Sequence, residues 1–155
     1  MPHQYRIEKQ RLAISLRLLG GQSVEGDMFL QPSPYGYSGG ERAVDVLNAR
    51  ASFVPVELDD GSVLLVQKDR VIEVRGDGLA EEDEIRLAIA IPSPLEITMT
   101  DGTLVEGSLM LEVPHDRQRA LDYLNDCRMR FLTVYTSEGA RLVNSKLIEL
   151  ARPLT

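Results

Sequence analysis

The chain contains the same three segments twice, in the same order. VEGDMFL at residues 24–30 returns as VEGSLML at 105–111, RAVDVLN at 42–48 returns as RALDYLN at 119–125, and VIEV at 71–74 returns as LIEL at 147–150. The spacing between copies is 81 residues for the first segment, 77 for the second and 76 for the third. Three ordered matches predict a tandem duplication of one folding unit.

The duplication divides the 155 residues into two units of similar size. We predict a first unit at residues 1–75, an acidic linker at 76–84 and a second unit at 85–155. Domains of about 70 residues are marginally stable alone, because they bury a smaller share of their surface than large domains. We therefore expect the two units to pack together, with pseudo-twofold symmetry.

Each unit opens with the pattern of a hairpin. Leu12, Ile14, Leu16 and Leu18 alternate with other residues, and the turn at Gly20-Gly21 leads to a second alternating segment. A period of two is typical of a half-buried strand. The second unit repeats the pattern around Asp101-Gly102. Gly26 and Gly107 recur within the second strand, where glycine permits a bend or a close backbone approach, or alternatively a ligand near the backbone.

A short amphipathic helix and three more strands follow in each unit. The helix has an apolar stripe at Ala43, Val44 and Leu47, and Asn48 can close it in a left-handed conformation. The fold class is therefore mainly β: five short strands forming an open-barrel-like unit, with one helix after the second strand. This order of elements resembles small SH3-like or Sm-like barrels. In Sm-like proteins the helix precedes the strands.

Composition and charge restrict the classes of partner. The formal net charge of −7 argues against tight binding to nucleic acid or anionic membrane, which need Lys and Arg, although a local basic patch would escape this argument. The single Cys127 excludes an internal disulfide and suits a reducing cytoplasm. The first nine residues lack an apolar stretch of signal-peptide length, and no run is long enough to span a bilayer.

Common enzyme classes need residues that this sequence lacks. The only histidines are His3 and His115, and the only cysteine is Cys127. These are almost too few side chains to form a histidine-based triad or a multi-histidine metal site. Glycine-rich nucleotide-binding motifs are absent from the sequence. We therefore predict no catalytic, cofactor or metal site, and no enzymatic activity.

Two features are candidate interaction sites. The first is the loop at residues 31–40, which is much shorter in the second unit and carries Tyr35 and Tyr37 among prolines and glycines. Tyrosine supplies rigid contact area at low entropic cost, so this is a candidate partner-binding loop; the alternative is a loop folded over its own barrel. The second is the pair three residues apart that recurs in both helices, Arg42 with Asp45 and Arg119 with Asp122. These residues form either surface ion pairs or an interfacial site.

These observations lead to two functional hypotheses. The first is a non-catalytic cytoplasmic interaction or assembly module that binds another protein or itself through exposed strand edges. The alternative is a single-stranded RNA-binding protein with an Sm-like or SH3-like surface. In that case Tyr35, Tyr37 or Tyr135 would stack on bases, and the arginines between residues 117 and 130 would contact phosphates.

Overall fold

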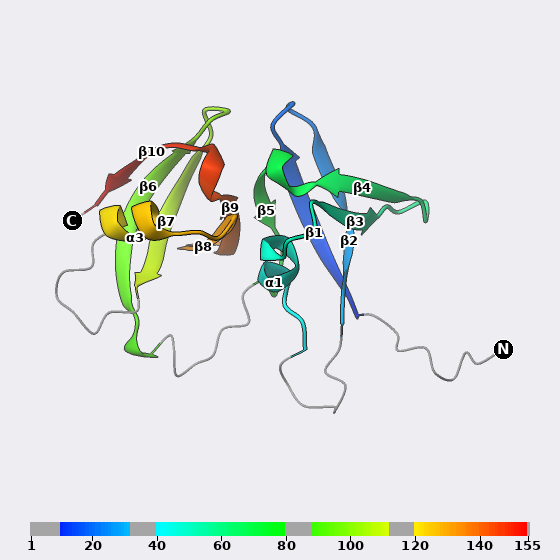
Figure 1. The fold of residues 1–155 in the computed structure, drawn as a ribbon, viewed down its shortest axis with the longest axis horizontal. Coiled ribbons are helices and arrows are strands. Elements are labelled where there is room, and N and C mark those ends of the chain that lie inside the picture. The colour runs from blue at the N-terminus through cyan, green and yellow to red at the C-terminus, as the bar shows by residue number, and fades with distance from the viewer. Residues whose placement is uncertain (1–9, 32–39, 80–87, 112–119, 155) are drawn as a thin grey trace.

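The computed structural model of the protein describes residues 10–31, 40–79, 88–111 and 120–154. The chain is mainly β, as predicted, and its strands form one ten-stranded antiparallel sheet (Figure 1). The strands are β1 (Gln10–Leu18), β2 (Ser23–Leu30), β3 (Phe53–Glu57), β4 (Val63–Gln67), β5 (Val71–Arg75), β6 (Ile91–Met99), β7 (Leu104–Leu111), β8 (Phe131–Thr136), β9 (Gly139–Asn144) and β10 (Ile148–Pro153). The helices given with both bounds are α1 (Ala43–Asn48) and α3 (Ala120–Asp126), residues 88–89 are also helical, and 3-10 turns lie at Lys68–Arg70 and Ser145–Leu147.

The two predicted hairpins are confirmed. β1 pairs with β2 and β6 pairs with β7, and Gly21 and Gly102 have positive φ angles in the turns between them. β2 and β7 also share one pattern of buried and exposed positions along their eight residues. Helices α1 and α3 follow the second strand of their halves, as expected.

Gly26 and Gly107 lie where another strand crosses closely over the hairpin. A Cβ atom on Gly26 would lie 2.4 Å from the carbonyl oxygen of Glu57, and one on Gly107 would lie 2.5 Å from that of Tyr135. No side chain fits at such distances, so both positions require glycine. The structural explanation given for these glycines is therefore supported at both sites.

Both halves have the same order of strand pairing. One half is ordered β5-β1-β2-β3-β4 and the other β10-β6-β7-β8-β9, and β9 pairs with β5 to join them. We call strands equivalent when they hold the same place in the two orders, as β5 and β10 do, or β4 and β9. The two halves lie side by side, with β5 and β9 in the middle and β4 and β10 on opposite flanks (Figure 1).

This joint disagrees with the predicted pseudo-twofold symmetry. A twofold axis makes each partner contribute the same surface, so it would pair β5 with β10 or β4 with β9. The observed pair, β5 with β9, joins strands that are not equivalent. The halves therefore meet head to tail.

Strand pairing also corrects the alignment of the third repeated segment. Val71 lies opposite Leu18, the last residue of β1, and Ile148 lies opposite Met99, the last residue of β6. Val71 therefore corresponds to Ile148, 77 residues later. The similarity of VIEV to LIEL, which paired Val71 with Leu147, is one residue out of structural register.

The start of the predicted linker belongs to the first half. Leu79 is 1% exposed and lies in the first half's hydrophobic core. A Cβ atom on Gly76 would come within 2.7 Å of the Ala13 carbonyl oxygen, so the chain leaves β5 in close contact with β1. The acidic residues 81–84 lie outside the described residues.

The C-terminal end of α1 is closed by a lysine instead of the expected asparagine. No described non-glycine residue has a positive φ, so Asn48 is not in the left-handed conformation. The buried Lys68 donates from Nζ to the carbonyl oxygens of Val46 at 2.6 Å and Ala49 at 3.4 Å. Burial lowers the pKa of this ammonium group, and the nearby charge of Arg130 lowers it further. With the helix end satisfied in this way, the Asn48 side chain can reach the other half.

Candidate functional site

The joint between the halves exchanges apolar side chains in both directions. Glu73 lies opposite Val143, and Val74 lies opposite Leu142, in the β5–β9 pair. Leu142 and Phe131 of the second half pack in the first half's core, and Ile72 of the first half packs in the second core. The two cores therefore interlock across the joint.

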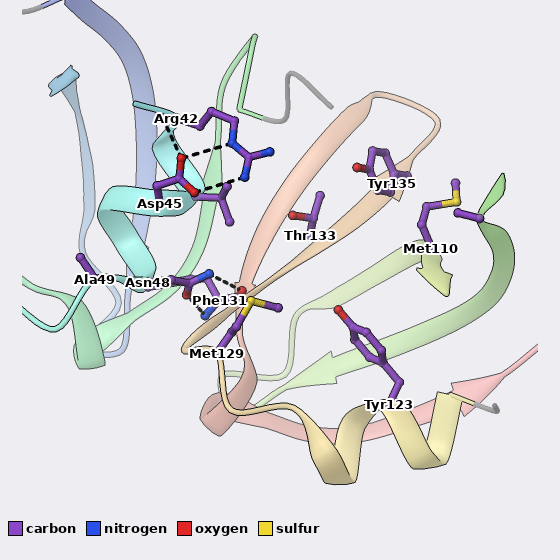
Figure 2. A pocket seen from close by; sticks show the side chains of 12 residues that line it. Arg42, Asp45, Asn48, Ala49, Met110, Tyr123, Met129, Phe131, Thr133 and Tyr135 are labelled. Atoms are coloured by element: carbon purple, nitrogen blue, oxygen red, sulfur yellow. Dashed lines mark hydrogen bonds and ion pairs between the residues drawn. The ribbon is translucent and has the colours of Figure 1, made fainter. Parts of the chain in front are cut away.

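Asn48 fastens the end of α1 to the first residue of β8. Its Nδ2 donates to the carbonyl oxygen of Phe131 at 3.1 Å, and its Oδ1 accepts from the Phe131 amide at 2.7 Å (Figure 2). One side-chain amide thus satisfies both main-chain groups of a residue 83 positions away. The sequence repeats this asparagine as Asn125 but does not indicate its partner.

A buried carboxylate holds arginines from both halves. Glu73 is 1% exposed and receives Arg17 at 2.5 Å, Arg75 at 3.0 Å and, from the second half, Arg141 at 3.4 Å. Arg17 also reaches across to Asp101 at 2.8 Å. Several cations around one carboxylate offset the cost of its burial.

Asp101 shows how this network affects a neighbouring group. Burial pushes the pKa of this carboxyl upward, but hydrogen bonds from Thr103 and the charge of Arg17 outweigh that effect and hold the pKa below its usual range. Another cation, Arg130, crosses the joint to Asp69 at 2.9 Å. Charges therefore contribute to the joint beside the apolar exchange.

A cleft of about 290 Å³ lies beside this joint (Figure 2). Its walls come from α1 in one half and from β7, α3 and β8 in the other. The lining residues are Arg42, Val44, Asp45, Asn48, Ala49, Ala90, Met110, Tyr123, Met129, Phe131, Thr133 and Tyr135. Aromatic and methionine side chains beside a charged pair are typical of surfaces that bind other molecules.

The structure places the predicted Arg42 and Asp45 pair in this cleft. The Asp45 carboxylate accepts from Arg42 Nε and Nη2 at 3.2 Å and from the Arg42 amide at 3.1 Å. These bonds hold the pKa of Asp45 below its usual value of 3.8. The pair is therefore partly exposed and lines the cleft. Of the other predicted residues, Asp122 lies in the first turn of α3, while Tyr35, Tyr37 and Arg119 lie outside the described residues.

We expect Asp45→Asn to lower the free energy of unfolding by about 0.5 kcal/mol at neutral pH, because the pair is partly exposed. The folded-state pKa lies below 3.8, so this stabilisation is present above pH 3.8 and is lost as the pH falls through the folded value. Urea unfolding of both proteins across the acid range should show their stabilities converging. A difference that stays constant with pH would show that Asp45 acts through packing.

The two outer strands of the sheet carry exposed apolar side chains. In the described part of the chain β4 pairs only with β3, and β10 only with β6. On the β3–β4 side Leu65 is 70% exposed and Phe53 52%, and on β10 Leu150 is 53% exposed. Val63 and Leu64 of β4 are exposed as well. The uncharged run VLLVQ of β4 is a sequence signal that could have identified this edge.

Comparison with protein-family models, with curated proteins and with solved structures finds no match to this chain. Among the described residues no helix is both long and apolar enough to cross a membrane, and no three His, Cys, Asp or Glu side chains gather as a metal site would require. The arguments about function therefore rest on the joint, the cleft and the open edges.

Proposed function

We propose that this chain is a non-catalytic interaction or assembly module, formed by tandem duplication and acting in the cytoplasm, which binds another polypeptide through its open strand edges. The observation that carries this proposal is the joint within the chain. There an edge strand of one half pairs with an edge strand of the other, while apolar side chains cross between the cores. Within the described residues, β4 and β10 at the two ends of the sheet have no further strand partner.

The character of β4 supports the proposal. An unpaired edge strand attracts other strands, and soluble proteins usually protect such edges with charged residues or proline. β4 has neither, and three of its five residues are exposed aliphatic side chains. A partner strand added here would gain main-chain hydrogen bonds and cover apolar surface together.

Binding of single-stranded RNA is the second candidate. Tyr123 and Tyr135 line the cleft, and aromatic rings there favour base stacking. Arg130, one of the arginines this hypothesis needs, is instead paired with Asp69 at 2.9 Å and also donates to the Leu47 carbonyl oxygen. The protein-binding proposal therefore has the stronger support.

The test is capture of partners from native cytosol by edge variants. We expect tagged wild-type protein to retain a specific protein after nuclease treatment, and Leu64→Arg or Leu150→Glu to reduce that capture about tenfold. Leu104→Glu is the matched control, because Leu104 is 57% exposed on β7, which has a neighbouring strand on each side. Capture that both edge variants leave unchanged contradicts the proposal. Capture lost on nuclease treatment favours RNA.

A further inference from the structure

We infer that the partner is a second copy of this chain, bound head to tail, with β10 of one copy pairing antiparallel with β4 of the next. This inference rests on the proposed function and names its partner. The contact would repeat the joint inside the chain, because β10 is equivalent to β5 and β4 is equivalent to β9. The joint within the chain is thus the template for a joint between chains.

Strand register identifies which residues would meet. Leu150 lies opposite Thr98 in the β10–β6 pair, as Glu73 lies opposite Arg17 in the β5–β1 pair. Leu150 therefore holds on β10 the place of Glu73 on β5.

The same comparison applies to β4 and β9. Leu64 lies opposite Val56, and Arg141 lies opposite Val134. Val56 and Val134 are equivalent, because they are the side chains that crowd Gly26 and Gly107 respectively. Leu64 thus holds the place of Arg141.

Both members of one ion pair across the joint are replaced together at the outer edges. Glu73 and Arg141 meet at 3.4 Å inside the chain. Their counterparts Leu150 and Leu64 are 53% and 37% exposed. Replacing one member alone would have left a charge facing an apolar group, whereas replacing both preserves a complementary contact. The two edges therefore match each other as the strands of the inner joint do.

Other groups that form the inner joint also recur at the open edges. Phe53 is 52% exposed where its equivalent Phe131 is fully buried. Asn125, the counterpart of Asn48, is exposed on α3, and the equivalent contact would join it to the main chain of Phe53 in the next copy. Gln67 stands in place of Asn144, whose side-chain amide crosses the inner joint to the Val71 carbonyl oxygen at 2.9 Å.

One position weakens the outer joint. β5 and β10 are the last strands of the two halves, and the register of each against its neighbouring strand, β1 or β6, shifts by one residue. The extra residue is Ile72 in β5 and Glu149 in β10. Ile72 is fully buried across the inner joint, whereas Glu149 is a carboxylate and would lose solvation on association. Self-association is therefore reversible and depends on concentration, and Glu149→Ile should strengthen it.

Head-to-tail contacts leave one open β4 and one open β10 at the ends of any short assembly. Such heterologous contacts produce a closed ring when the rotation between copies closes, and a filament when it does not. Either product distinguishes this arrangement from a dimer in which one edge pairs with itself.

The experiment exchanges charges between the two edges of the purified full chain and measures its mass by sedimentation across protein concentrations. We expect wild-type protein to associate, and Leu64→Arg and Leu150→Glu each to weaken association about tenfold or more. Mixing these two variants should restore association. In the mixture, β10 of the Leu150→Glu variant can pair with β4 of the Leu64→Arg variant, so that a carboxylate meets a guanidinium as in the inner joint. The reverse contact, between β10 of the Leu64→Arg variant and β4 of the Leu150→Glu variant, joins two unchanged edges. Leu104→Glu should associate like wild-type protein.

Two results overturn the inference. The first is that the wild-type protein and the Glu149→Ile variant both stay monomeric at all concentrations. The second is that Leu64→Arg or Leu150→Glu alone still associates like wild-type protein. If β4 paired with β4 of another copy, or β10 with β10, only one of the two edges would be needed, and the variant on the other edge would retain association. Circular dichroism of each variant confirms that the fold is kept. If the pure protein is monomeric while edge variants still lose capture of a different protein, self-assembly fails and the proposed function stands.

Discussion

Replacing Gly26 or Gly107 with alanine is expected to lower the free energy of unfolding by about 3 kcal/mol each, near the upper end of what overpacking costs. The new Cβ atom would lie 2.4 Å from the Glu57 carbonyl oxygen in the first half, or 2.5 Å from that of Tyr135 in the second. Each obstacle is backbone, so a rotamer change cannot relieve it. Urea unfolding followed by circular dichroism measures the loss.

Gly20→Ala is the matched control for both substitutions. A Cβ atom there meets nothing within 4 Å, and Gly20 has no positive φ. Its stability should stay within about 0.5 kcal/mol of the wild-type value, as for ordinary surface substitutions. If Gly26→Ala and Gly107→Ala behaved like this control, the close crossing of the third strand over each hairpin would be wrong.

Local sequence patterns were sufficient to predict the hairpin and the helix of the first half. The alternation of Ile14 and Leu16 and the glycine turn beside it depend on neighbours in sequence, and the hairpin was found where they predicted it. The helix of residues 43–48 follows from an apolar stripe of the same local kind. The repeated glycines indicated a backbone constraint correctly, because a close approach leaves its mark directly on residue type.

The joint could not be predicted, because it depends on contacts between residues far apart. Nothing near Glu73 in the sequence indicates that it will be buried beside Arg141, 68 positions later. The head-to-tail order reflects which edges pair, and a repeat permits either that order or a twofold. Sequence comparison also did not show that Val71 corresponds to Ile148, because VIEV and LIEL match best when Val71 is aligned with Leu147.

The candidate site was predicted in part for the same reason. Arg42 and Asp45 were identified by their spacing of three, which places them together on one helix turn. Their position in a cleft depends on Tyr135 and Tyr123 from the other half, which sequence spacing cannot reveal. The sequence also could not predict that Phe53 is exposed while its equivalent Phe131 is fully buried, because the two sequences are alike there.

Phe131→Ala should be the most destabilising change at the joint, lowering the free energy of unfolding by about 3–5 kcal/mol. The ring is fully buried and belongs to the first half's core although Phe131 lies in the second half. The Asn48 hydrogen bonds go to the main chain of residue 131, so they survive the substitution and the loss reports the ring alone. Urea unfolding at low protein concentration keeps separate chains apart.

Phe53→Ala provides the comparison, because Phe53 is the same residue type at the equivalent position on the open edge. It is 52% exposed, so removing its ring should lower the free energy of unfolding of the isolated chain by about 1 kcal/mol. Its larger effect should appear in association between chains, where the ring would be covered as that of Phe131 is. Equal losses of chain stability for the two variants would contradict the assignment of Phe131 to the joint. An unchanged association constant for Phe53→Ala would show that the open edge is not a second copy of that joint.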